Sequence, residues 1–189
     1  MENILKTYLK LCNTPSDINE HLPTLYKYAK KCNHVTEMGV RNVVSTYALA
    51  LGGPKKLICY DIVNCDVSLL EESVKHFIDF KFVKANTLKI TIEPTELLFI
   101  DTLHNYNQLS AELKLHAGKV SKYIIFHDTT SYEKYGESYQ PIREPVIGIW
   151  PAIEEFLIAN PEWVIAERFT NNNGLTILKK SIKKSSNDN

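Results

Sequence analysis

The pattern of apolar and polar positions divides the chain into a short helical part and a longer part in which strands and helices alternate. Apolar residues recur at helical spacing over residues 4–12 and, after Pro15 and Ser16, over residues 22–29. Short apolar runs of strand length then follow at residues 34–38, 57–61, 82–85, 97–101 and 123–128. We therefore expect two helices before the first strand of a sheet.

The segments between these runs carry apolar stripes with helical spacing. The stripes cover residues 44–51, 70–78 and 106–113, and the spacing of Ser68 and Glu71 suggests a capping box at the start of the second stripe. Strands that alternate with helices and are almost wholly apolar are typical of a parallel sheet covered on both faces. The pattern predicts an α/β, doubly wound, Rossmann-like fold.

The C-terminal third has a different pattern. A helix is expected from Trp150, and the apolar runs 163–166 and 175–178 flank an Asn-rich turn, as in an antiparallel hairpin. Residues 129–147 show no clear period, and a loop of that length is typically a lid, a binding loop or a disordered segment. Its aromatic and basic residues predict a cover over a substrate; they are Tyr132, Tyr135, Tyr139 and Arg143.

Composition narrows the class of protein. With 189 residues, 44% hydrophobic and 23% charged, the chain fits one folded domain: N-terminal helices (1–32), an α/β core (33–180) and a flexible tail (181–189). The 22 basic residues balance the 22 acidic ones, so no net field favours nucleic acid or an anionic membrane as a partner. No segment resembles a membrane span or a secretory signal, which predicts a cytoplasmic protein. The four cysteines show no CxxC pair and no zinc-ligand spacing with the histidines, which favours buried thiols.

Polar residues at the ends of the first two strands predict a nucleotide-like ligand. In doubly wound sheets, ligands bind outside the carboxyl ends of the strands. Gly39 after Glu37 allows close approach of backbone, and the amides near Asn42 could meet a ligand carboxylate. Asp61 ends the second strand, where a carboxylate can accept hydrogen bonds from the two hydroxyls of a ribose. Together these signals favour an adenosine-containing ligand.

The fourth and fifth strands end in a second polar group. If the two strands pair, Asp101 and Asp128 lie close enough to share a divalent cation or a substrate hydroxyl, because neighbouring strands are about 4.8 Å apart. His104 follows and is a candidate general base, since an unperturbed imidazole has a pKa of about 6.5. In the alternative interpretation, Asp101 caps the next helix and His127 merely packs at the end of its strand. The other four histidines have no comparable neighbours.

These residues resemble a known family, the class I S-adenosylmethionine-dependent methyltransferases, nearest to their cephalosporin-hydroxylase-like and sugar O-methyltransferase-like members. The resemblance covers about residues 35–178. It rests on E-x-G at 37–39 with Ser45-Thr46 following, on Asp61, on F-I-D-x-x-H-x-Y at 99–106 and on I-F-H-D at 125–128. It implies a seven-stranded sheet with an antiparallel last strand, and a cofactor across the ends of strands one, two and four.

The resemblance also implies the activity and the site. We expect methyl transfer from S-adenosylmethionine to a hydroxyl of a small molecule or sugar, assisted in metal-dependent relatives by Mg2+. The expected cofactor-binding residues are Glu37, Gly39, Asp61 and Asp101. The expected metal ligands are Asp101, His127 and Asp128, and the expected catalytic residues are His104 and Asp101.

One position departs from the family pattern. The glycine-rich turn often reads E-x-G-x-x-x-G, but Val43 occupies the last position, where its side chain is expected to crowd the methionine end of the cofactor. This favours an alternative, a methyltransferase-like module that binds without catalysis. An NAD-dependent oxidoreductase is a further alternative, against which the missing G-x-G-x-x-G and the terminal hairpin both argue. The sequence leaves the acceptor and the oligomeric state open, a homo-oligomer included.

Overall fold

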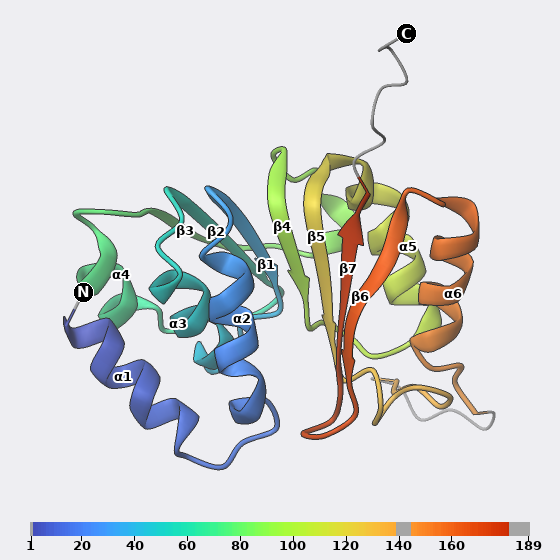
Figure 1. Cartoon of the computed structure of the whole chain (residues 1–189), viewed down its shortest axis with the longest axis horizontal. Helices are drawn as coiled ribbons and strands as arrows, with labels where there is room; N and C mark the ends of the chain where they lie inside the picture. The colour runs from blue at the N-terminus through green and yellow to red at the C-terminus, as the bar shows by residue number, and fades with distance from the viewer. Residues whose placement is uncertain (1, 139–144, 182–189) are drawn as a thin grey trace, which may run out of the picture.

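A single seven-stranded sheet organises the chain (Figure 1). The computed structural model describes residues 2–138 and 145–181. The strand order is β3-β2-β1-β4-β5-β7-β6, with β7 antiparallel to both of its neighbours and the other pairs parallel. The strands are β1 His34–Met38, β2 Lys56–Asp61, β3 Asp79–Lys84, β4 Thr95–Ile100, β5 Val120–His127, β6 Trp163–Phe169 and β7 Leu175–Lys180. The predicted α/β class, the mostly parallel sheet and the terminal hairpin are confirmed.

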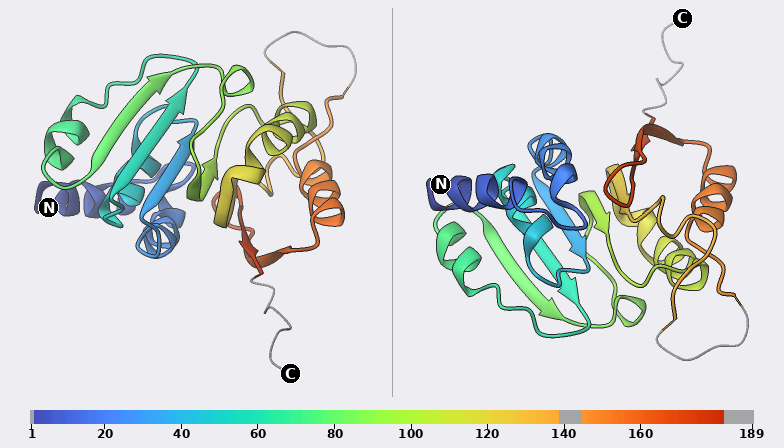
Figure 2. Two further views of the ribbon diagram at one scale, coloured as in Figure 1. Left: turned by 90° about the horizontal axis from the view of Figure 1, so that it is seen from above. Right: turned by 90° about the horizontal axis from the view of Figure 1, so that it is seen from below.

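Helices cover both faces of the twisted sheet (Figure 2). One apolar core joins the sheet to α1 Glu2–Cys12, α2 Leu22–Ala29, α3 Val44–Leu51 and α4 Ser68–Val74. The other joins it to α5 Tyr106–His116 and α6 Trp150–Ala159. Single 3-10 turns lie at η1 Asn19–His21, η2 Thr87–Lys89 and η3 Ala117–Lys119. Within the described parts of the chain, no helix is long and apolar enough to cross a membrane.

One expectation and one alternative interpretation about helix starts are wrong. The Ser68–Glu71 capping box is not formed, because Asp66 accepts hydrogen bonds from the backbone N–H (3.1 Å) and the hydroxyl (2.6 Å) of Ser68. Asp101 does not cap α5 either. The cap is Asn105, whose side chain accepts a 2.9 Å hydrogen bond from the backbone of Gln108. This leaves the carboxylate of Asp101 available to other partners.

The segment between α1 and α2 lies against the turn that joins β6 and β7. The Asn172 side chain accepts a hydrogen bond from the Glu20 backbone (3.0 Å) and donates one to the Ser16 carbonyl (2.8 Å). His21 Nε2 lies 3.0 Å from the Asn171 carbonyl. The N-terminal helices are therefore fastened to the C-terminal hairpin beside the carboxyl end of β5.

The loop that follows β5 is tied back on itself by backbone hydrogen bonds. Ile149 donates to the Tyr132 carbonyl (2.8 Å), Gly148 to that of Lys134 (2.9 Å), and Gly136 to that of Val146 (2.8 Å). We call the described parts of this loop, residues 129–138 and 145–149, the arm. Two of the predicted substrate contacts, Tyr139 and Arg143, lie outside the described residues.

Candidate functional site

A cavity of about 610 Å³ opens at the carboxyl ends of β1, β2, β4 and β5. Its wall includes the turn after β1, the segment after β2, the segment that follows β3 and residues of the arm. Five predicted site residues line it: Gly39, Asp61, Asp101, His104 and Asp128. The side chains of Glu37 and His127 lie behind this wall, where both are buried.

Glu37 connects β1 to α3 from within the core. Its carboxylate is fully buried and accepts hydrogen bonds from the hydroxyls of Ser45 (2.5 Å) and Thr46 (2.7 Å). Burial raises the pKa of Glu37 to about 7, although these hydroxyl donors pull it the other way. Glu37 thus acts on the cavity through the position of the turn in front of it. This contact also explains why Ser45-Thr46 follows the E-x-G motif.

Gly39 is required by close contact between two strand ends. Its φ is +88°, and a Cβ at this position would lie 1.9 Å from the carbonyl oxygen of Asp101. The Gly39 backbone also donates a 2.9 Å hydrogen bond to the carbonyl of Tyr60 on β2. The chain can turn away from β1 here only because no side chain is present.

Later in this turn, two residues other than glycine adopt a backbone conformation that usually favours glycine. Arg41 has φ 43° and Val43 has φ 63°, both in the left-handed region. For a β-branched residue this conformation is a strained exception. The expectation that Val43 crowds the ligand is wrong, because its side chain is 7% exposed and packs in the core with α3 instead of lining the cavity.

Asp61 holds the turn in place. One carboxylate oxygen accepts hydrogen bonds from the amides of Val40 (2.8 Å) and Arg41 (3.0 Å), and the other from the amide of Val63 (2.9 Å). Burial raises the pKa of Asp61, but the three amide bonds outweigh it and the net shift is downward. Two of the turn's amides are therefore engaged by Asp61, not turned toward a ligand carboxylate. Each carboxylate oxygen still has capacity to accept a ribose hydroxyl.

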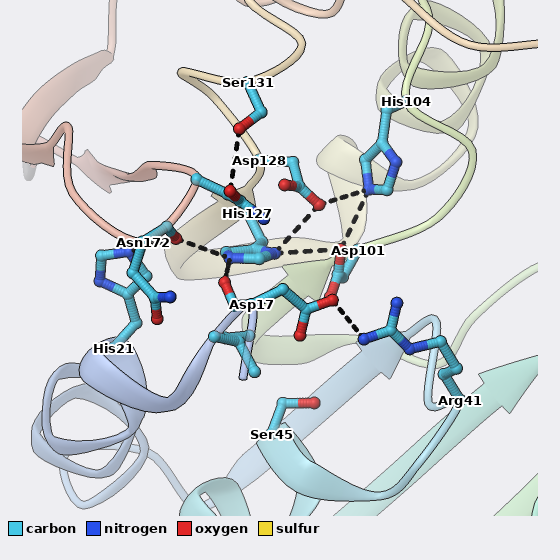
Figure 3. A network of polar contacts seen from close by, with 12 residues as sticks. Asp17, His21, Arg41, Ser45, Asp101, His104, His127, Asp128, Ser131 and Asn172 are labelled. Carbon is cyan, nitrogen blue, oxygen red and sulfur yellow. Dashed lines mark hydrogen bonds and ion pairs between the residues drawn. The ribbon is translucent and has the colours of Figure 1, made fainter. Parts of the chain in front are cut away.

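His104 lies at the centre of a carboxylate cluster (Figure 3). Its Nε2 is 3.1 Å from Asp101 Oδ1 and 2.9 Å from Asp128 Oδ2. Its Nδ1 is 2.8 Å from Glu137 Oε1 on the arm, and its ring stacks on Tyr132 at 4.6 Å between centroids. The β4 and β5 ends therefore converge as the sequence predicts, and the arm closes the cluster on one side.

His127 forms the back of the same cluster. Its Nδ1 lies 3.4 Å from Asp101 Oδ1 and 3.2 Å from Asp128 Oδ2. Its Nε2 lies 3.1 Å from the Asp17 carbonyl and 3.3 Å from that of Asn172. Figure 3 shows the ring between the N-terminal segment, the hairpin turn and the two carboxylates. His127 therefore links the cluster to both of these segments.

The neighbouring carboxylates determine the protonation state of the His104 and His127 rings. Burial disfavours the charged ring, but the hydrogen bonds and charges of Asp101 and Asp128 outweigh it and raise the pKa of His104 and of His127 to about 10. In return, the pKa values of both carboxyls are lowered despite their burial. At neutral pH His104 is thus a proton donor at both nitrogens. The predicted general base needs the other, neutral form.

The cluster suits a divalent cation. Asp101, His104 and Asp128 each offer one ligand atom, and these atoms lie within 4.8 Å of one another. Asp128 Oδ1 is buried and has no hydrogen-bond partner among the described residues. Oxygen ligands suit Mg2+, Ca2+ or Mn2+, and an added imidazole shifts the preference toward transition metals. His104 joins the two carboxylates in this group, and His127, a metal ligand expected from the sequence, faces the same carboxylates from behind.

A further buried carboxylate, which the sequence did not single out, supports another part of the cavity wall. Glu112 on α5 is fully buried and accepts hydrogen bonds from the hydroxyls of Thr87 (2.6 Å) and Thr102 (2.8 Å) and from the Gln108 amide (2.8 Å). Those three residues line the cavity near Asn86, on the side of β3. In the sequence, Glu112 looks like one more polar position of an amphipathic helix.

Comparisons with known proteins place this fold among methyltransferases. No model of a protein family matches the sequence, and no curated protein matches it. Among solved structures, N-methyltransferase NodS from Bradyrhizobium japonicum WM9 with S-adenosyl-L-homocysteine has a TM-score of 0.63 at 13% identity, covering 94% of this chain and 98% of that one.

Two further structures have the same likeness. A putative caffeoyl-CoA O-methyltransferase from Staphylococcus aureus has a TM-score of 0.61 at 12% identity, covering 95% of this chain and 91% of the other. Magnesium protoporphyrin IX methyltransferase from Synechocystis PCC 6803 with bound SAM has a TM-score of 0.59 at 13% identity, covering 93% and 90%. At these identities the likeness concerns the fold. The chain therefore has the Rossmann-like fold of S-adenosylmethionine-dependent methyltransferases.

Proposed function

We propose that the protein is an S-adenosylmethionine-dependent methyltransferase that acts on a hydroxyl of a small molecule or sugar. The observation that carries the proposal is the continuity of one cavity. It runs from Asp61, at the end of β2, to the cluster around His104 at the ends of β4 and β5. A ligand with a ribose at one end and a reactive centre at the other fits this arrangement.

The cofactor half of the cavity is built by backbone as much as by side chains. Gly39 lets the ends of β1 and β4 come together at the cavity wall, and Asp61 faces the cavity with oxygens able to accept ribose hydroxyls. S-adenosylmethionine, when bound, supplies a methyl group on an activated sulfonium. The protein's main contribution is then to place an acceptor oxygen in line with that methyl group.

The acceptor half is the carboxylate and imidazole cluster. Asp101 and Asp128 can accept a hydrogen bond from the acceptor hydroxyl and so orient it. His104 can take the hydroxyl proton only from the neutral state, which the two carboxylates disfavour. We therefore infer that His104 acts as a base only in the state in which its ring is neutral and no metal is bound to it.

A divalent cation is the alternative way to activate the hydroxyl, and it would replace His104 as the base because a metal-bound imidazole has no free electron pair. Asp101, His104 and Asp128 would hold it, with Mg2+ the leading candidate because two of the three ligands are hard oxygens. Such an ion lowers the pKa of a hydroxyl bound to it. The partly exposed Asp101 side chain keeps this group within reach of the cavity.

Calorimetric titration tests the proposal directly. We expect the protein to bind S-adenosylmethionine and S-adenosylhomocysteine and not NAD. Methyl transfer to candidate hydroxyl acceptors, followed with a labelled methyl group, should then respond to Mg2+. Binding of NAD alone would overturn the proposal in favour of an oxidoreductase.

A binding module without catalysis is the second candidate, and one observation favours it. The turn after β1 retains strained left-handed residues at Arg41 and Val43, and Asp61 engages two of its amides. These properties fit a turn whose role is to keep its shape and not to take part in a reaction. Tight binding of S-adenosylhomocysteine without any methyl transfer would support this candidate.

A further inference from the structure

Arg41 and Asp17 form an ion pair at the cavity, although they come from separate parts of the fold (Figure 3). Arg41 belongs to the turn after β1, and Asp17 to the segment between α1 and η1. Both residues line the cavity, and the Arg41 side chain is 68% exposed. An ion pair this exposed contributes little to folding stability. Its position therefore needs an explanation other than stability.

The charges that line the cavity leave this pair free for a ligand. Arg41 and His104 are the basic side chains among the described lining residues, against five carboxylates. Asp61 is bound by three amides, and the other three acidic residues contact His104: Asp101, Asp128 and Glu137. Only Arg41 and Asp17 combine opposite charges outside these two groups.

The backbone of the turn supports the same conclusion. Ligand carboxylates often bind to backbone amides at such turns, but Asp61 already engages the amides of Val40 and Arg41. These two amides are therefore not available to a ligand carboxylate, whereas the guanidinium of Arg41 is a charged donor on the cavity wall. Arg41 also has a φ of 43°, a conformation in which arginine is unusual and strain is often associated with function.

We propose that Arg41 and Asp17 bind the amino acid end of S-adenosylmethionine, Arg41 its α-carboxylate and Asp17 its α-ammonium. A ligand with both charges on one carbon can replace the ion pair without leaving either side chain unpaired. The planar guanidinium matches a carboxylate with two parallel hydrogen bonds. The proposal rests on the proposed function and names the residues that recognise this part of the cofactor.

The same contact would align the cofactor with the reacting centre. The backbone carbonyl of Asp17 lies 3.1 Å from His127 Nε2, and the opposite nitrogen of that ring faces Asp101 and Asp128. The position of the Asp17 segment is therefore linked to the cluster that would hold the acceptor. Asp17 acts as a binding residue here, and His127 as a positioning residue.

The test compares two ligands that differ in the amino acid end. S-adenosylhomocysteine carries it, and 5′-methylthioadenosine lacks it. Arg41→Gln removes the positive charge. It leaves an unbranched, non-glycine side chain at position 41, so the left-handed backbone places a similar demand on both proteins. We expect the substitution to weaken S-adenosylhomocysteine about 10- to 100-fold, the range for a hydrogen bond to a charged group, and to leave 5′-methylthioadenosine unchanged. Asp17→Asn should show the same selectivity.

Lys56→Gln is the matched control. Lys56 is also in an exposed ion pair, with Glu93, but it lies at the start of β2 and away from the cavity. The Lys56→Gln variant should bind S-adenosylhomocysteine and 5′-methylthioadenosine with unchanged affinity. Equal loss of both ligands in Arg41→Gln, or no loss of either, would overturn the inference while the proposed function stands. If the unaltered protein binds neither ligand, the inference and the proposed function both fail.

Discussion

Gly39 and Asp101 lie in backbone contact where β1 and β4 end, so closely that a Cβ on Gly39 would come within 1.9 Å of the Asp101 carbonyl oxygen. The same backbone position sets the Asp101 carboxylate against His104 and His127. A single glycine thus controls the distance between the turn after β1 and the cluster around His104.

Replacement of Gly39 by alanine should therefore be severe. We expect Gly39→Ala to lower the free energy of unfolding by more than about 3 kcal/mol, because a backbone overlap adds to the cost of about 1–2 kcal/mol for a left-handed alanine. Gly53→Ala is the control, since Gly53 also has a positive φ (+73°) but has open space around it. Denaturant unfolding of both variants measures the difference. Equal losses of stability in the two variants would show that the backbone at Asp101 shifts to make room for the added methyl group.

Asp61→Ala should weaken the binding of S-adenosylhomocysteine by about 1.5–3 kcal/mol, the range for charge-assisted hydrogen bonds. The structure adds a second expected effect, a loss of stability, because the amides of Val40 and Arg41 lose their acceptor. Asp66→Ala is the control: Asp66 lies in the same loop, outside the cavity wall. Calorimetry with both variants checks the prediction. Unchanged affinity in Asp61→Ala would place the ribose elsewhere.

Glu37 predicts a pH dependence of stability. Its pKa is about 7 in the folded chain and ordinarily 4.5, so between these values the folded state holds a proton that the unfolded state releases. The contribution of Glu37 to stability is therefore largest below pH 4.5 and falls as the pH rises toward 7, by about 3 kcal/mol in all.

Glu37→Gln removes this titration and keeps the shape of the side chain. The wild-type protein should lose stability relative to the variant between pH 5 and pH 8, measured by urea unfolding at each pH. Histidines titrate identically in both proteins and cancel in the difference. A constant difference across this range would mean that Glu37 is ionised in the folded chain throughout.

Cation binding should compete with a proton. His104 is protonated at neutral pH, so a cation bound by Asp101, His104 and Asp128 must displace that proton, and its affinity should rise with pH up to about 10. Isothermal titration with Mn2+ and Mg2+ at two pH values measures the trend. Asp101→Asn and Asp128→Asn should lose the cation, whereas the exposed Asp66→Asn should retain it. Full methyl transfer in excess chelator would exclude a role for the ion.

The arm should respond to ligand. Tyr132 stacks on His104 and Glu137 contacts the same ring, so a ligand that enters the cluster meets both side chains. From the sequence we expect residues 129–147 to move without ligand and to close over the acceptor. Hydrogen exchange should then slow in this segment when cofactor and acceptor are added together. Strong protection in both states would make the arm a fixed part of the wall.

The main features of the sheet could be read from the sequence because its strands are almost wholly apolar and polar residues follow directly at their ends. The convergence of Asp101 and Asp128 followed from the pairing of β4 with β5 alone. Which of the two histidines, His104 or His127, groups with these carboxylates at the cavity wall could not be predicted in this way. It depends on how the first residues after β4 turn back toward the sheet, which no periodicity encodes.

The remaining site residues depend on contacts between distant segments. Asp17 reaches the cavity because residues 16–21 are held by Asn171 and Asn172, and a pattern within either segment carries no trace of the other. Arg41 had a visible signal, a charged residue inside a turn that usually contains glycine. That Arg41 pairs with Asp17 and lines the cavity is visible only in the folded chain.

The hydrogen bonds between the N-terminal segment and the hairpin turn can form only late in synthesis of the chain. Glu20 and Asn172 are separated by 152 positions, so the segment that carries Asp17 leaves the ribosome long before its partner exists. The parallel strands can assemble first, with this edge of the cavity still unformed. The side of the cavity at Asp17 is thus completed only after the β6–β7 hairpin has been made, and chains truncated before β7 should fold their sheet in part yet leave this side of the cavity unformed.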